Sequence, residues 1–382
     1  MTCFKSLLHS YYLPFALFSS TNGTRKHSQP VKPIEPNDED VYFDSFPPKD
    51  HYQVPKNPIV LCHGLSGFDK IILIPSIYQL TKIIRQSIMA NNSEHFIETE
   101  DQPTGNGFLE IEYWIGVKEK LEKKGCTVLV TKVPSFGSIE ERALSLHSFL
   151  EKETQNLRHT ATKNEIYNVK GDDTASSIVP GPIKLNLIAH SMGGLDCRFL
   201  ISKIKNKNYQ VLSLTTVSTP HHGSEMADYV VNLIQDLKKL APSEPEKLIL
   251  PPSIHELTTK YMSFFNATTP NDPTVSYFSY GSCFSPRWFN TFYMTWKIIH
   301  NLSGGQPNDG MVTVQSSKWG HFRGCLLDTD HLDIINWKNK LQRDFSKSVF
   351  NASKAASQSL RPDIDILNFY LYIADDLARR GF

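Results

Sequence analysis

The sequence predicts an α/β fold, in which a mostly parallel central sheet has helices on both faces. Short apolar runs of strand character alternate with segments of helical periodicity, and several of the runs are apolar throughout. Strands that are buried on both faces have this pattern, and they occur in parallel sheets covered by helices. A chain of 382 residues is long enough for one large domain with insertions.

In chain order, we expect strands at residues 58–62, 127–131, 184–189, 211–217, 275–280 and 322–327. We expect helices at residues 71–89, 113–124, 193–204 and 364–380. Ser138 and Glu141 have the spacing of a capping box, which predicts a further helix with Ala143, Leu144, Leu146 and Leu150 on its buried side. Residues 91–107 and 158–182 are polar and rich in turn residues, which is typical of surface insertions.

The charge balance excludes some classes of partner. Forty Lys and Arg residues stand against 39 Asp and Glu, a net charge of +1, so no basic field is available to hold nucleic acid. Contact with lipid must therefore come from a local apolar surface. No apolar run reaches the roughly 20 residues of a membrane-spanning helix. The cysteines lack metal-ligand spacing and are expected to be buried free thiols: Cys3, Cys62, Cys126, Cys197, Cys283 and Cys325.

Residues 1–55 are expected to form a targeting or leader segment ahead of a domain at residues 56–382. Residues 1–34 contain basic residues and serines but no acidic residue, which favours a mitochondrial presequence. A secretory signal is the alternative, because residues 13–18 are moderately apolar. Asn-x-Ser/Thr triplets suit that alternative and occur at Asn22, Asn91, Asn266, Asn301 and Asn351. A disordered tail would also have this composition.

Ser191 is the predicted nucleophile of the chain. The segment Ala189-His190-Ser191-Met192-Gly193-Gly194 lies between a predicted strand and a predicted helix. A nucleophile elbow requires this position, with small flanking residues that let the strand and the helix approach closely. The alternative is a serine that only caps the helix.

His331 and Asp309 are the predicted base and acid. In chains with such an elbow, the acid and then the histidine follow the serine, each in a loop after a strand. His331 follows the strand expected at residues 322–327, whereas His221 and His222 lie too close to the elbow strand. Asp309 lies in a tight turn after the preceding strand. Asp330 and Asp333 are alternatives, but an acid next to the histidine in sequence seldom reaches its Nδ1.

The oxyanion hole should combine two backbone N–H groups. One belongs to Met192, the residue after the serine, and the other to Leu65, in the loop after the first strand. His63, in the same loop, is expected to brace it by hydrogen bonding.

These motifs resemble those of the bacterial triacylglycerol lipases of the Pseudomonas and Burkholderia type, and more closely those of their fungal mitochondrial relatives. The resemblance begins near Asn57, covers about five-sixths of the chain and is carried by Asn57–Asp69, Ala-His-Ser191-Met-Gly-Gly-Leu, Ser218–Ser224, Asn308-Asp309-Gly-Met-Val and Asp330-His331-Leu-Asp. It implies an α/β-hydrolase fold, a triad of Ser191, Asp309 and His331, and oxyanion donors at Leu65 and Met192. It also implies an acylglycerol substrate and no cofactor.

The bacterial relatives hold a structural calcium ion near the catalytic histidine, and Asp333 occupies one ligand position. Trp337 stands where that family has a glutamine, and residues 283–297 contain no acid. A calcium site needs several oxygen ligands, so we expect no metal in this chain.

A lid-like insertion is expected within about residues 225–300. The stretch of twenty residues from Tyr277 to Trp296 holds nine aromatics, which favours a lipid-facing role over ordinary core. The expected function is triacylglycerol hydrolysis through an acyl-enzyme, with peripheral contact to a lipid surface. A phospholipase A1 or an acyltransferase with the same triad is the first alternative, and an inactive lipid-binding module is the second.

Overall fold

The computed structural model describes residues 40–65, 113–168, 181–240, 250–286, 290, 292–337 and 364–382. The helix expected at residues 71–89 and the insertion expected at 91–107 lie outside these residues. Cys3 also lies outside them, and the other five cysteines are buried and free.

A single seven-stranded sheet forms the centre of the described structure. Its strands are β1 (Tyr42–Phe43), β2 (Ile59–Cys62), β3 (Val128–Val130), β4 (Ile183–His190), β5 (Tyr209–Val217), β6 (Ser276–Ser282) and β7 (His321–Leu326). They are arranged in the order β1-β7-β6-β5-β4-β2-β3, and every neighbouring pair is parallel. The predicted fold class and its six expected strands are confirmed, and β1 is an additional edge strand.

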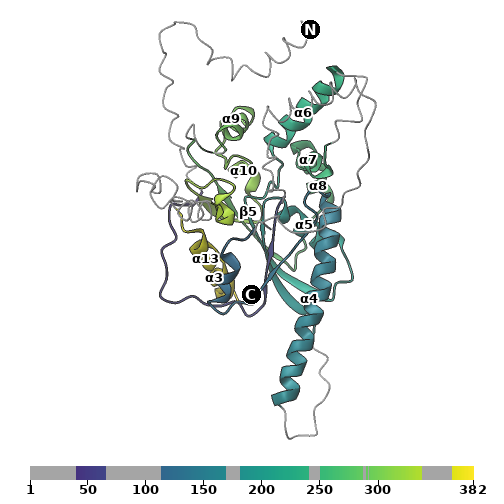
Figure 1. Cartoon of the computed structure of the whole chain (residues 1–382), viewed down its shortest axis with the longest axis vertical. Helices are drawn as coiled ribbons and strands as arrows, with labels where there is room; N and C mark the ends of the chain where they lie inside the picture. Colours follow the sequence, from purple (N-terminus) through teal and green to yellow (C-terminus); the bar gives the residue numbers. More distant parts are fainter. Residues whose placement is uncertain are drawn as a thin grey trace, which may run out of the picture.

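Helices cover both faces of this sheet (Figure 1). They are α3 (Val117–Glu122), α4 (Ile139–Asn168), α5 (Gly193–Lys203), α6 (Glu225–Leu240), α7 (Pro252–Glu256), α8 (Thr259–Thr268), α9 (Tyr293–Leu302), α10 (Val314–Ser317) and α13 (Ile366–Arg379), with a short 3-10 helix at Asp333–Ile335. In Figure 1, α3 and α13 lie on one side of the sheet, and α4 and α5 lie on the other. Helices α6 to α9 gather at one end of it.

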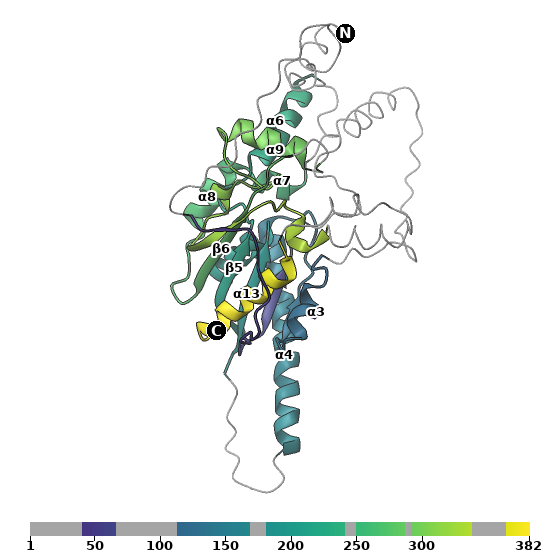
Figure 2. The ribbon, with the colours of Figure 1, turned by 90° about the vertical axis from the view of Figure 1, so that its left-hand side faces the viewer.

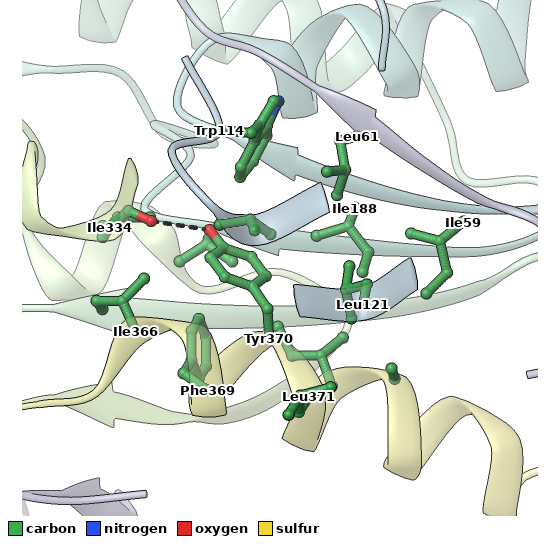
Figure 3. Close-up of a cluster of buried hydrophobic side chains, with 14 of the residues drawn as sticks. Ile59, Leu61, Trp114, Leu121, Ile188, Ile334, Ile366, Phe369, Tyr370 and Leu371 are labelled. Carbon is green, nitrogen blue, oxygen red and sulfur yellow. Dashed lines mark hydrogen bonds between the residues drawn. The ribbon is translucent and has the colours of Figure 1, made fainter. Parts of the chain in front are cut away.

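The side chains of alternate strand residues point into two separate hydrophobic cores, one on each face of the sheet. Ile59, Leu61 and Ile188 point to the face covered by α3 and α13. Figure 3 shows this core, in which the Tyr370 hydroxyl of α13 donates a hydrogen bond to the carbonyl of Ile334 at 3.2 Å. Val60 and Leu187 point to the other core, beneath α4 and α5. The helix predicted at residues 364–380 is therefore present as α13, and it packs onto the domain.

Helix α4 begins with the predicted capping box. The Ser138 amide donates to the Glu141 carboxylate at 2.8 Å, and the Glu141 amide donates to the Ser138 hydroxyl at 3.1 Å. Two expectations for this helix were wrong. Leu144 is 47% exposed instead of buried. Residues 158–168 continue the helix to Asn168 instead of forming a loop, and Figures 1 and 2 show it extending beyond the sheet.

Residues assigned to the leader contribute to the packed domain. β1 pairs with β7 through Tyr42 and Phe43, and Phe46 is 4% exposed within the core. This short strand lies in a polar, Pro-rich stretch and forms only because β7 offers an open edge. The domain therefore extends towards the N-terminus beyond the boundary expected at residue 56.

The range 225–300 contains β6, a central strand of the sheet, so the lid-like insertion expected within this range lies outside β6 and stays a prediction. The aromatic stretch from Tyr277 to Trp296 is largely core. Six of its aromatics are less than 9% exposed, namely Tyr277, Phe278, Tyr280, Phe284, Phe292 and Trp296. Their density therefore reflects packing at the end of the sheet, and the lipid-facing interpretation of these six was wrong.

Candidate active site

Ser191 lies in a strained turn between β4 and α5. Its φ angle is 55°, a left-handed conformation that is uncommon outside glycine and typical of a nucleophile elbow. The following helix comes so close that a Cβ at Gly193 would lie 2.6 Å from the His63 carbonyl oxygen, and one at Gly194 would clash with Thr219. The small residues of the motif are therefore required by close approach of the backbone.

Ser191, His331 and Asp309 form one chain of hydrogen bonds. His331 Nε2 is 3.0 Å from Ser191 Oγ, and His331 Nδ1 is 2.8 Å from Asp309 Oδ2. An ionised carboxylate only accepts hydrogen bonds, so Nδ1 donates to Asp309 and Nε2 is left to accept the serine proton. The three residues come from three separate loops at the carboxyl ends of β4, β6 and β7. The structure therefore brings together the three residues selected from the sequence.

The Asp309 carboxylate is fully buried and has four hydrogen-bond donors. Oδ1 accepts from the amides of Met311 and Val312 at 2.9 and 2.8 Å. Oδ2 accepts from His331 and from the hydroxyl of Ser282 at 3.0 Å. Ser218 Oγ lies 2.7 Å from Ser282 Oγ and extends this network.

Sequence reasoning did not select Ser282 or Ser218. Each is a polar residue at the carboxyl end of a buried strand, and Ser218 also begins one of the motifs that carry the resemblance. Parallel strands bring these ends to one edge of the sheet, where ligands and catalytic groups gather.

The loop that carries His331 is held by its own carboxylates. Asp330 Oδ1 accepts from the amides of Leu332 and Asp333, both at 3.0 Å, and Asp333 Oδ2 accepts from the Asp330 amide at 2.9 Å. Asp330 and Asp333 therefore brace the loop, and neither takes the place of Asp309.

A calcium site of the bacterial kind does not fit these residues. One oxygen of Asp333 is used by the loop backbone, and Trp337 replaces the expected glutamine. In the part of the chain that the structure describes, no three acidic, His or Cys side chains group as metal ligands.

The loop after β2 lies directly against the nucleophile. A Cβ at Gly64 would lie 2.6 Å from the Cβ of Ser191, so only glycine fits there. The fully buried guanidinium of Arg142 donates to the carbonyls of His63 and Gly64 at 3.0 Å each, and it pairs with Asp196 of α5. Leu65 follows directly and packs against the cluster that contains Met192, which is buried at the start of α5.

His63 braces this loop, as predicted, and is not a second base. Its Nε2 accepts from the Val133 amide at 3.1 Å, and its Nδ1 donates to the Gly64 carbonyl at 2.8 Å. Burial lowers the pKa of His63 to about 4, so the ring is neutral at physiological pH. His221 is likewise a buried structural residue, with Nε2 at 2.9 Å from the Thr216 hydroxyl.

The class of protein follows from the site and the sheet together. A serine in an elbow turn is hydrogen-bonded to a histidine, the histidine is hydrogen-bonded to a buried aspartate, and all three lie at one edge of an all-parallel sheet. The chain is a serine hydrolase with the α/β-hydrolase fold. A metagenomic carboxyl esterase of known structure supports the fold, with a TM-score of 0.50 over 99% of this chain and 91% of that one at 13% identity.

Sequence comparison identifies the family. The chain is 54% identical over 346 residues to triacylglycerol lipase 2 of Saccharomyces cerevisiae, covering 90% of this chain and 98% of the yeast protein. A triacylglycerol lipase of Burkholderia plantarii is 25% identical over 217 residues, which is 57% of this chain and 43% of that one. The family model described as "Putative serine esterase (DUF676)" matches residues 159–247. The chain therefore belongs to the triacylglycerol lipase family.

Proposed function

We propose that this protein is a mitochondrial lipase that hydrolyses triacylglycerol with Ser191, His331 and Asp309 as its catalytic triad. The observation that carries the proposal is the continuous hydrogen-bonded chain from Ser191 Oγ through His331 to Asp309. The high identity to the yeast triacylglycerol lipase supports the choice of substrate.

The geometry supports a two-step mechanism. His331 Nε2 accepts the Ser191 proton as Oγ attacks the ester carbonyl carbon, and Asp309 stabilises the imidazolium that forms. The N–H groups of Leu65 and Met192 hold the tetrahedral oxyanion. The imidazolium then protonates the departing alcohol oxygen of the glyceride. A water molecule attacks the acyl-enzyme by the same steps in reverse order and releases the fatty acid.

Exposed apolar side chains support peripheral contact with a lipid surface. Phe264 of α8 is 63% exposed and Leu302 of α9 is 56% exposed. Both helices belong to the group at one end of the sheet in Figure 1. Among the described residues, no helix is long and apolar enough to cross a bilayer.

The composition of residues 1–34 supports the mitochondrial part of the proposal, because basic residues and serines occur there without any acid. The triplet at Asn266 lends no support to secretion. Its side-chain amide donates to the His221 carbonyl at 2.9 Å within the fold, where a glycan would break the contact.

The test of the proposal is the variant Ser191→Ala, compared with wild type on emulsified triacylglycerol and on monomeric p-nitrophenyl butyrate. We expect turnover of both substrates to fall by about 10⁴- to 10⁶-fold, because the acyl-enzyme cannot form. Wild type should be labelled by a fluorophosphonate, and the variant should not. Wild type should also hydrolyse emulsified triacylglycerol faster than monomeric p-nitrophenyl butyrate.

Thermal unfolding of Ser191→Ala serves as the control for folding. Substantial turnover by a folded Ser191→Ala would show that Ser191 is not the nucleophile. Faster hydrolysis of phospholipid vesicles than of triacylglycerol would reassign the substrate.

A further inference from the structure

Tyr113 lies between the loop after β2 and the nucleophile elbow. The Gly64 amide donates to Tyr113 Oη at 2.9 Å, and the same oxygen lies 2.7 Å from Nδ1 of His190. His190 is the last residue of β4 and directly precedes Ser191. One hydroxyl group therefore connects the backbone of the proposed oxyanion loop to the nucleophile turn.

Burial decides the protonation states of Tyr113 and His190. Burial raises the pKa of the Tyr113 hydroxyl, which keeps its proton, whereas burial and then the nearby His331 lower the pKa of His190 well below its ordinary value. Tyr113 Oη accepts from Gly64, and we assign its single proton to Nδ1 of a neutral His190. His190 Nε2 then carries the ring proton, and it has no hydrogen-bond partner among the residues that the structure describes.

His190 also packs against the proposed base. The ring centroids of His190 and His331 are 4.5 Å apart, with an interplanar angle of 42°. A neutral ring at this distance supports His331 sterically without repelling the imidazolium that forms during the reaction.

The contacts of Gly64 fix the orientation of the next amide. Its carbonyl accepts from His63 at 2.8 Å and from Arg142 at 3.0 Å. The N–H of Leu65 belongs to the same planar trans peptide and points away from that carbonyl. The hydrogen bond from the Gly64 amide to Tyr113 Oη fixes the other peptide group of Gly64.

We propose that Tyr113 and His190 are positioning residues, whose hydrogen bond holds the oxyanion loop against the nucleophile turn and the imidazole of His331. The proposal rests on the proposed function, because it assumes that the Leu65 N–H binds the oxyanion. Tyr113 itself is well anchored, since the next residue, Trp114, is buried and packs edge-on against Tyr370 at 5.5 Å (Figure 3).

The test is Tyr113→Phe in the full chain, assayed on monomeric p-nitrophenyl butyrate. The ring contacts remain and only the hydroxyl is lost. We expect kcat to fall about ten- to hundredfold, which is less than the loss of an oxyanion donor itself, with KM changed less than about twofold. The Ki of an alkyl trifluoromethyl ketone, which forms a tetrahedral adduct with Ser191, should rise by the same factor.

Tyr209→Phe is the matched control. Tyr209 Oη lies 2.9 Å from Nδ1 of His147, so it forms the same kind of hydrogen bond, but at the start of β5, away from the elbow. Its loss should leave kcat and Ki unchanged. An unchanged kcat in Tyr113→Phe, or a fall without a rise in Ki, would overturn the proposal. An equal loss in Tyr209→Phe would also overturn it.

His190 provides a second measurement that does not depend on Tyr113→Phe folding. His190→Asn places an amide oxygen near the position of Nδ1, whereas His190→Leu offers no acceptor. The Asn variant should retain about tenfold more kcat than the Leu variant, and equal values would overturn the proposal. Ser191→Ala in parallel separates the two hypotheses, because an active Ser191→Ala refutes the triad and not only the positioning pair.

Discussion

His63 shows how one neutral side chain holds the loop beside the nucleophile. The ring is 5% exposed, and its two nitrogens bond backbone groups on different segments. Burial, and after it the positive charges of Arg142 and Lys132, lower its pKa from 6.5 to about 4. The unfolded chain therefore binds a proton more tightly than the folded chain between these two pH values.

We predict that His63 makes the fold sensitive to acid. Its contribution to the free energy of unfolding is complete above pH 6.5 and is lost as the pH falls towards 4, by an amount on the order of 3 kcal/mol. His63→Gln supplies an acceptor that does not titrate, so its unfolding free energy should depend less on pH in this window. Urea unfolding at pH 7, 5.5 and 4.5 measures the difference, and parallel pH slopes for the two proteins would contradict it.

At the residue scale, the sequence selected three residues that the structure joins in one hydrogen-bonded chain. Ser191, Asp309 and His331 could be selected because each lies in a recognisable turn after a strand, in the order that this fold requires. Ser282, Tyr113 and His190 could not be assigned roles. Their contacts join segments far apart in the chain, and nothing in their local spacing indicates a partner.

At the scale of the loop after β7, carboxylates hold His331 in place. The reciprocal bonds of Asp330 and Asp333 close the turn, and the Thr329 amide donates to the Cys283 carbonyl at 3.1 Å. Asn336 adds a bond from its side-chain amide to the Ile115 carbonyl at 2.8 Å. Several short contacts to the backbone thus hold this loop in place.

Chelation should therefore leave this enzyme unchanged. With excess EGTA, hydrolysis of p-nitrophenyl butyrate and the thermal midpoint should stay within error, because a cation stabilises only a fold that binds it. Asp330→Ala, in contrast, should lower both kcat and the midpoint, since two buried amides lose their acceptor. Loss of activity in EGTA that calcium restores would refute this account of the loop.

The central strands were predictable as elements, because runs such as Leu185–Ala189 are apolar throughout. Helices α6 to α10 were not assigned from the sequence, and neither were residues 158–168 of α4 or strand β1. Residues 158–168 are polar and lack apolar periodicity, so nothing local distinguishes a solvated helix from a loop there. β1 depends on its pairing with β7, which is a tertiary effect.

At the scale of the whole molecule, the N-terminal segment of the domain is bound to its C-terminal helix. Phe46 packs on Phe369 with ring centroids 5.0 Å apart. Asp375 accepts from Lys49 Nζ at 2.7 Å and from the Gln53 amide at 2.8 Å. The Lys56 amide donates to the carbonyl of Phe382, the last residue of the chain, at 3.1 Å.

These contacts predict where the chain can be shortened. A protein of residues 40–382 should match the full chain in thermal midpoint and in hydrolysis of p-nitrophenyl butyrate, because it retains β1 and Phe46. A protein of residues 56–382 exposes the edge of β7 and loses the buried ring of Phe46, a change worth about 3–5 kcal/mol for a phenylalanine side chain. Its midpoint should fall by several degrees or more, although the triad is intact. If residues 56–382 unfold at the same temperature as residues 40–382, the segment is not part of the domain. A lower midpoint for residues 56–382 would show that residues 40–55 belong to the folded domain.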